Sequence, residues 1–293
     1  GSDLHVGMDR DRKSTVYRGD GELEITSNGE LTVNWTFWVG YNSDGPAKGT
    51  VNQNGGLVTN QSVDGTRGIR IGNASQGIYN LKSGTLNAQR SVYVGWSGKT
   101  DSQMNVMGGT FLGDNNMDVI VSNTEHGTSS GTYYVHGTNP DSIIVGNPDG
   151  TGAGDWIQND GGTLKLGLDQ SGATTIQMEN DVHFAAGSTL DLSFLEGVDP
   201  VYGQEWTVMS WNRDLLEVGG DGTDLFDKLG KSELTMADVP LSFASGVNPL
   251  DWEVKFKDTG SGVMTVTAIP EPSSLLLLGL GSLLLMKRRR RRA

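Results

Sequence analysis

The chain has 293 residues, a formal net charge of −13, 43 glycines, 8 prolines and no cysteine. The lack of cysteine excludes disulfides, thiolate metal sites and cysteine nucleophiles. The acidic balance argues against nucleic-acid binding, because phosphates would be repelled. The sequence starts with Gly-Ser and no apolar export segment follows, so we expect a processed chain or fragment whose export signal is missing.

Residues 1–166 carry three short motifs that recur in the same order. The first is a β-rich run that ends in glycine, at Gly7, Gly40, Gly72, Gly95 and Gly146, with Ser122 in the same place in "VIVS". The second is Gly-x-Leu or a relative of it, at Gly29, Gly55, Gly84, Gly109, Gly137 and Gly162. The third precedes the second, as in "GIYNL" at Gly77, and successive second motifs lie 25 to 29 residues apart.

Apolar residues alternate within these runs, as Ile69 with Ile71 and Val92 with Val94 do. A period of two places one face of a strand inside and the other outside. One such repeat cannot bury a core, whereas stacked repeats can. We therefore predict an all-β fold, a right-handed parallel β-helix of about six turns from Gly21 to roughly Leu166. A β-sandwich or a propeller is the alternative, although a propeller blade takes about 40 residues or more.

Residues 167–268 have a different sequence pattern, with longer alternating runs such as "EWTVMSW" and "DWEVKF". Only residues 214–239 have a pattern compatible with short helices. The open end of a β-helix exposes unpaired strand edges, so a terminal cap is required. We predict three regions: a repeat β-helix over residues 1–166, a β-rich cap or small sandwich over 167–268, and a distinct tail over 269–293.

No catalytic constellation stands out. The four histidines, at positions 5, 126, 136 and 183, are isolated in the sequence, and we interpret them as polar surface residues. Polysaccharide lyases and hydrolases with β-helix folds need acids from neighbouring turns to converge with a base. Such acids are present in two successive turns, but a solvated acidic face is the favoured interpretation; they are Asp114, Asp118 and Glu125, then Asp141, Asp149 and Asp155. We predict no catalytic residue, no enzyme activity and no cofactor.

Two further patterns suggest ligands only weakly. In "NPDGTGAGD", Asn147, Asp149 and Asp155 have oxygen spacing that suits calcium, although an ordinary turn is the favoured interpretation and we expect no metal. The acidic run "DGTDLFD" is interpreted in the same way. Trp35 and Trp96 are candidates for stacking on a sugar, whereas core packing is expected for Trp206, Trp211 and Trp252 in the cap.

The tail begins with Pro270 and Pro272, which prevent a helix just before a 14-residue uncharged stretch, Ser273–Met286. As a helix this stretch would span about 21 Å, short of a hydrocarbon core of about 30 Å. Snorkelling of the basic residues behind it would relieve the mismatch, and the positive-inside rule places those residues in the cytoplasm. The predicted membrane segment comprises Ser273, Leu275, Leu276, Leu277, Leu278, Leu280, Leu283, Leu284, Leu285 and Met286. The predicted cytoplasmic basic tail comprises Lys287, Arg288, Arg289, Arg290, Arg291 and Arg292.

This order of Pro270-Glu271-Pro272, a short apolar helix and an arginine cluster resembles the PEP-CTERM sorting domain of Gram-negative bacteria. The resemblance implies that an exosortase, a membrane enzyme similar to cysteine transpeptidases, recognises the three residues and processes the chain near them. The repeats, best seen in "GIYNLKSGTLNAQRSVYVG" over Gly77–Gly95, resemble glycine-rich repeats of autotransporter passengers and of surface proteins from bacteria that make exopolysaccharide.

These features together predict an exported structural or adhesive protein. It would be anchored in the inner membrane by its C-terminal helix before processing, and would then reach the cell surface or the extracellular matrix. Exopolysaccharide or the cell envelope is the expected partner. The alternative is a carbohydrate-active β-helix, either a lyase or a binding module. For the tail, the alternative is an ordinary anchor with the body in the cytoplasm.

Overall fold

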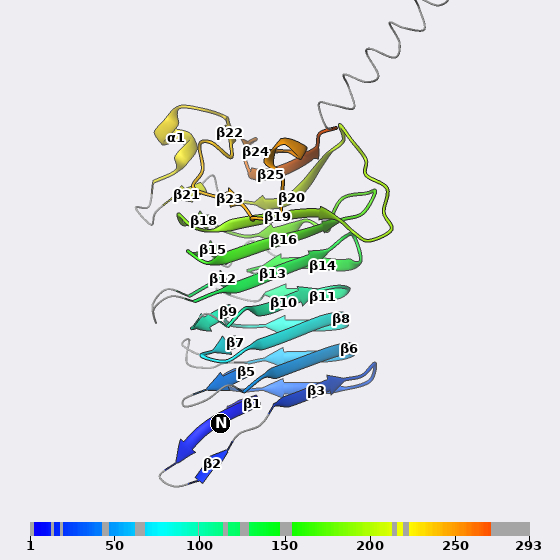
Figure 1. Cartoon of the computed structure of the whole chain (residues 1–293), viewed down its shortest axis with the longest axis vertical. Helices are drawn as coiled ribbons and strands as arrows, with labels where there is room; N and C mark the ends of the chain where they lie inside the picture. Colours follow the sequence, from blue (N-terminus) through cyan, green and yellow to red (C-terminus); the bar gives the residue numbers. More distant parts are fainter. Residues whose placement is uncertain are drawn as a thin grey trace, which may run out of the picture.

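The computed structural model describes residues 3–12, 15–17, 20–42, 47–61, 68–98, 100–113, 117–123, 129–146, 154–212, 216–218 and 223–270. Its strands coil into a β-solenoid of about five turns, and only 4% is helical in the part of the chain that it describes. Figure 1 shows the strands stacked along the long axis, with the amino-terminal strands at one end. The predicted all-β class and the stacking of the repeats are confirmed.

One face of the solenoid is a nine-stranded sheet in the described part of the chain. Its neighbours pair in parallel from one turn to the next, except that β2 pairs antiparallel with β1. In spatial order its strands are β2 (Thr15–Tyr17), β1 (Leu4–Arg12), β5 (Phe37–Asn42), β7 (Ile69–Asn73), β9 (Val92–Ser97), β12 (Val119–Val121), β15 (Trp156–Gln158), β18 (Val182–Phe184) and β21 (Leu216–Val218).

The other two faces form one sixteen-stranded sheet, because two long strands, β6 (Gly49–Asn60) and β8 (Gly77–Ala88), belong to both. The first of these faces, which we call the groove face, also contains β3 (Gly21–Ile25), β10 (Ser102–Val106), β13 (Gly131–His136), β16 (Gly162–Leu168), β19 (Thr189–Phe194) and β23 (Ser242–Phe243). The second contains β4 (Glu30–Val33), β11 (Gly109–Gly113), β14 (Pro140–Val145), β17 (Ile176–Met178) and β20 (Glu205–Trp211).

Equivalent inward residues stack into columns that form the core. On the groove face one column is fully buried, and parallel register joins each member to the next; it runs Val51, Tyr79, Met104, Tyr133, Leu164, Leu190. The alternation of buried and half-buried positions along β13 follows the period of two. Stacking therefore supplies the hydrophobic core that a single repeat lacks.

The number of turns differs from the prediction of about six. Six equivalent strands do lie on the groove face between Gly21 and Leu166, namely β3, β6, β8, β10, β13 and β16. Six strands enclose only five turns, because each turn is completed by the strand of the next repeat. The structure has about five turns.

Parallel pairing also continues beyond Leu166, where the motifs fade from the sequence. Strand β16 pairs with β19, and β18 pairs with β21, in the same parallel manner as the earlier turns. Antiparallel pairing begins only where β25 (Gly262–Ala268) adds to β20, followed by β24 (Trp252–Asp258) and β22 (Glu233–Thr235). The short helices α1 (Leu225–Leu229) and η2 (Pro249–Asp251) lie in the same region. The division of the chain into domains at residue 166 stays a prediction.

Candidate functional site

The folded body ends where the predicted sorting tail begins. Ala268 is the last residue of β25 and is buried, and its carbonyl accepts a hydrogen bond from the Gly203 N–H at 2.9 Å. The Ile269 N–H donates to the Asp251 carbonyl at 2.7 Å. Pro270 is the final described residue, so Glu271, Pro272 and the predicted membrane and basic segments lie outside the described residues. Among the helices of the described part, none is long and apolar enough to span a membrane.

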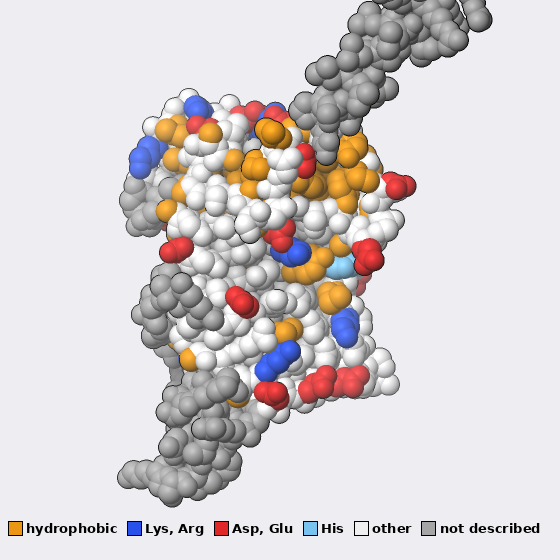
Figure 2. All heavy atoms as spheres, in the orientation of Figure 1, with side chains coloured by type: hydrophobic (Ala, Val, Ile, Leu, Met, Phe, Trp, Pro, Cys, Tyr) orange, Lys and Arg blue, Asp and Glu red, His pale blue; other side chains and the backbone are white. Residues whose placement is uncertain are grey.

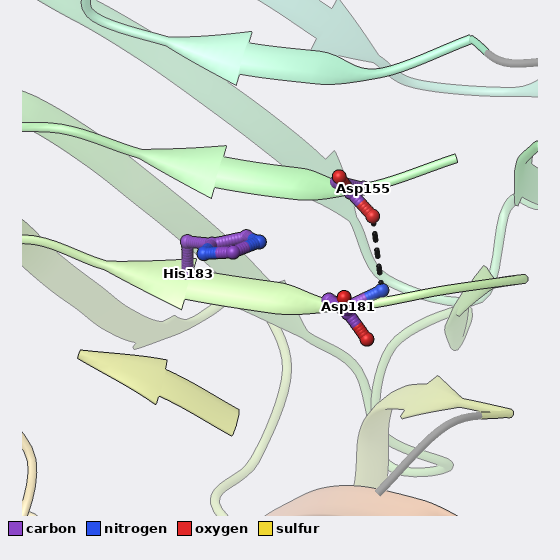
Figure 3. Close-up of side chains that lie close together, drawn as sticks. All are labelled: Asp155, Asp181 and His183. Carbon is purple, nitrogen blue, oxygen red and sulfur yellow. Dashed lines mark hydrogen bonds between the residues drawn. The ribbon is translucent and has the colours of Figure 1, made fainter. Parts of the chain in front are cut away.

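A column of three aspartates runs along the nine-stranded sheet. Asp118, Asp155 and Asp181 each stand directly before a strand, at equivalent positions of three successive turns, because Val119, Trp156 and Val182 are in register. We call these three residues the carboxylate column. The N–H of Asp155 donates to Asp118 Oδ1 at 3.2 Å, and the N–H of Asp181 donates to Asp155 Oδ1 at 3.1 Å (Figure 3).

The first member of this column is hard to ionise. Burial raises the pKa of Asp118 from 3.8 to about 6. Hydrogen bonds from the Asp155 N–H and from Ser91 Oγ lower that pKa without offsetting the burial, and the negative charge of Asp155 raises it further. A protonated Asp118 reduces the repulsion that three stacked carboxylates would otherwise generate.

His183 lies beside the column, two residues beyond Asp181 on β18 (Figure 3). Its Nδ1 lies 2.5 Å from Glu217 Oε2 on β21, and the Glu217 side chain is buried. Ligand atoms of Asp155, Asp181 and His183 lie within 4.8 Å of one another, close enough for a metal ion. Calcium usually takes six to eight oxygen ligands, however. Asp155 Oδ1 is also occupied by Asn180 Nδ2, at 2.6 Å, and by the Asp181 N–H. The column is thus an internally hydrogen-bonded brace between turns.

The sequence analysis named Asp118 and Asp155 as acids of successive turns but missed Asp181. It also treated His183 as isolated, whereas its ring contacts the Glu217 carboxylate. Asp155 and Asp181 are 26 residues apart in the chain, and only the parallel register of β15 with β18 brings them together. The signal was present, since "DVIV", "DWIQ" and "DVHF" place an aspartate at the same position of three repeats. Of the other acids considered, Asp141 belongs to β14 on a different face, whereas Asp114, Glu125 and Asp149 lie outside the described residues.

The remaining candidates have mixed outcomes. Asn147 and Asp221 lie outside the described residues, as does His126. Asp155 is placed from the first calcium candidate, and Asp224 and Asp227 from the second, where Asp224 is the N-cap of α1 and Asp227 lies in its first turn. His136 ends β13, where Asn139 Nδ2 lies 3.3 Å from its Nδ1. The expected core packing in the cap is confirmed, because Trp206 and Trp211 are buried and Trp252 packs against the core.

Two tryptophans of the repeats, Trp38 and Trp96, lie in an aromatic cluster around Arg70. Its guanidinium carbon lies 3.8 Å from the Trp96 ring centroid and 4.8 Å from that of Trp38. Tyr93 meets Trp96 edge-on at 4.5 Å. Trp96 therefore has a ring face covered by a cation, a stabilising contact that leaves less of the ring for a sugar. Trp35 is half-buried.

The comparisons with known proteins point to the tail. Residues 268–292 match the family model of the PEP-CTERM protein-sorting motif. No curated protein and no solved structure matches the chain. The match begins at Ala268, so the motif starts on the last residue of β25. The carboxy-terminal end of the chain is a PEP-CTERM protein-sorting motif.

Proposed function

We propose that this chain is an exported structural protein, sorted by an exosortase-type enzyme to the cell surface or the extracellular matrix. The observation that carries the proposal is the sorting motif at residues 268–292, joined without a spacer to a folded β-solenoid. A solenoid of stacked repeats is a stiff, extended body, which suits a spacer or adhesive rod. The acidic surface would keep such rods apart and soluble.

The connection between the folded body and the apolar stretch of the tail is short. Residues 269–272 separate the last strand from the apolar stretch, and four residues reach at most about 14 Å. If Ser273–Met286 crosses the membrane, the cap end of the solenoid stands close to the bilayer surface until processing. The alternative with the body in the cytoplasm does not account for a sorting motif, whose enzyme acts on exported chains.

We also propose that the chain is not an enzyme. The carboxylate column and His183 do combine acids with a base, but Asp155 accepts hydrogen bonds from Asn180 and the Asp181 backbone. His183 is held by the buried Glu217. These contacts connect successive turns, so a bracing role explains them without a substrate.

The sorting proposal is tested with Pro270→Ala/Glu271→Ala in a bacterial host that contains an exosortase. We expect the double variant to stay in the membrane fraction at the mass of the unprocessed chain, whereas the wild type is released at lower mass. Glu196→Ala/Pro200→Ala is the matched control, because both residues are exposed on the body and outside the motif. Equal mass and equal release of the motif variant and the wild type would overturn the proposal.

A further inference from the structure

A groove with a volume of about 610 Å³ lies on the groove face, lined by polar side chains together with Met107 and Ala244. Outward side chains of β8, β10, β13, β16 and β19 line it, so it crosses several successive turns. The outward residues of these strands that line the groove form two parallel columns, because the strands are paired in register. The groove lies on a different sheet from the carboxylate column.

The first column begins as a chain of side-chain amides. Asn80 Nδ2 donates to Asn52 Oδ1 at 2.8 Å, and Asn105 Nδ2 donates to Asn80 Oδ1 at 2.8 Å. These bonds hold the amides in one orientation. Each amide nitrogen has a second N–H beyond the one used in the chain, and each carbonyl oxygen has a second lone pair. The column is therefore a preorganised row of donors and acceptors.

Tyr134 follows Asn105 in the same column and supplies an aromatic surface. Its phenol lies over Gly167 of β16, where an added Cβ would come within 2.7 Å of the Tyr134 hydroxyl oxygen. A larger residue at 167 would displace the ring, so the glycine lets the ring lie against the sheet. Lys165 Nζ is 5.3 Å from the ring centroid, farther than the 3.8 Å between the Arg70 guanidinium carbon and the Trp96 ring, and it forms an ion pair with Asp191 at 3.1 Å.

The second column carries uncharged hydrogen-bonding groups, namely Gln103, Thr132 and Thr163. Thr163 Oγ1 lies 2.8 Å from Thr189 Oγ1 of the next turn. Turns repeat about every 4.8 Å along the stack. Hydroxyl and amide groups thus recur at the spacing of the turns on both sides of the Tyr134 ring.

The charges of the groove select among possible occupants. Its only acid and its only cation among the lining residues, Asp191 and Lys165, neutralise each other. Most charged side chains on the face seen in Figure 2 are scattered among uncharged ones, apart from a row of acidic side chains near its lower edge. An anionic polymer would gain nothing from the groove and would be repelled by a chain with net charge −13. A peptide cannot add as a further strand, because β10, β13 and β16 are each paired on both sides.

We propose that this groove binds a neutral polysaccharide in an extended conformation along the solenoid axis. Sugar hydroxyls would exchange hydrogen bonds with the amide and threonine columns, and one pyranose ring would stack on Tyr134. The hydrogen-bonding groups repeat from turn to turn along the solenoid axis, as sugar units repeat along a polysaccharide. Each turn would therefore contact an equivalent part of the ligand. The proposal goes beyond export and sorting and does not depend on them.

The test is isothermal titration of the purified full chain, held in a zwitterionic detergent without a sugar headgroup. The probes are cellohexaose, laminarihexaose and mannohexaose, with hexagalacturonate as the anionic comparison. At least one neutral probe should bind and the anionic probe should not. Tyr134→Ala should weaken binding roughly fivefold to tenfold through lost stacking, whereas Tyr134→Phe should stay within about twofold.

Thr132→Val provides a second variant that preserves volume and removes one hydroxyl. It should weaken binding roughly threefold to tenfold. Tyr202→Ala is the matched control, because this exposed tyrosine is not among the groove residues, and it should leave binding unchanged. The proposal is overturned if no neutral probe binds, if hexagalacturonate binds as well as the neutral probes, or if the Tyr134→Ala and Thr132→Val variants both bind like the wild type.

Discussion

Single residues in this solenoid owe their properties to the turns above and below them. Ser122 has a φ of +65°, in the left-handed region, at the position where other repeats carry glycine. Its Oγ compensates by hydrogen bonding to the Asp160 carbonyl at 2.6 Å, in the following turn. Gln53 is likewise fully buried, yet it accepts a hydrogen bond from the Tyr79 hydroxyl at 2.7 Å and donates to the Thr85 carbonyl. Polar residues inside the stack are tolerated because neighbouring turns supply partners.

The buried carboxyl of Asp118 should make the stability of the protein depend on pH. Its pKa rises from 3.8 when unfolded to about 6 when folded, so the native state holds the proton more tightly. The resulting stabilisation is fully present below about pH 4 and is lost as the pH rises through about 6. An amide does not ionise, so Asp118→Asn should gain on the order of 1–3 kcal/mol relative to wild type between pH 4 and pH 7.5.

Urea unfolding of both proteins at the two pH values measures this change. The exposed Asp141→Asn serves as the control for the general effect of removing a negative charge, and it should show a smaller change with pH. If the stability difference between Asp118→Asn and wild type is the same at pH 4 and pH 7.5, the argument from burial is wrong.

Glycines inside the strands of the nine-stranded sheet allow a later turn to approach closely. Gly95 lies within β9 with a φ of +79°, and an added Cβ would lie 2.3 Å from the Ser130 carbonyl oxygen. Ser130 directly precedes β13, so this contact is where one turn passes close to the next. The recurring glycine of the first sequence motif is thus explained by the close approach of another turn's backbone as well as by backbone freedom.

Gly95→Ala should therefore destabilise the protein by at least about 2 kcal/mol, since left-handed backbone strain and a clash with backbone act together. Gly246→Ala is the matched control, because an added Cβ there meets nothing within 4 Å and the backbone is not left-handed. It should change stability by less than about 1 kcal/mol. Chemical unfolding monitored by circular dichroism compares the two, and equal effects would contradict the steric explanation.

At the scale of the whole molecule, the two ends differ. Figure 2 shows hydrophobic side chains gathered at the upper end, where β20, β24 and β25 lie in Figure 1. Large hydrophobic residues are exposed beside the point where the chain leaves for the sorting tail: Tyr202 at 54%, Leu250 at 68% and Ile269 at 36%. Backbone hydrogen bonds bring them together in space. The N–H of Gly203, next to Tyr202, donates to the Ala268 carbonyl, and the carbonyl of Asp251, next to Leu250, accepts from the Ile269 N–H. An apolar rim at this end fits contact with a bilayer surface.

Leu250→Ser should accordingly weaken the binding of residues 1–270 to neutral phosphatidylcholine vesicles, by roughly threefold to tenfold. Leu57→Ser is the matched control, since Leu57 is 38% exposed on β6 near the opposite end. Co-sedimentation with vesicles measures the difference. An equal loss for both variants would show that general hydrophobicity, and not the rim, governs the association.

Local patterns were enough to predict much of this protein. Alternating apolar residues and recurring glycines at 25- to 29-residue intervals led to an all-β stack, and Pro270-Glu271-Pro272 with its flanks led to the sorting motif. These predictions succeed because period-two burial, corner sterics and a linear motif are properties of contiguous residues. The hand of the coil and the membrane helix stay predictions.

Only the tertiary structure showed which side chains of different turns lie together, because this depends on the register between strands. The carboxylate column joins residues 26 and 37 positions apart, and the groove combines Asn105, Tyr134 and Lys165 from three repeats. Loops of unequal length separate these residues, so spacing in the chain does not determine which side chains meet. Strand pairing does, since a shift of one residue would turn every outward group inward. The sequence by itself determined that the chain is a stack of repeats with a sorting address, and the pairing of its strands decided which side chains share a surface.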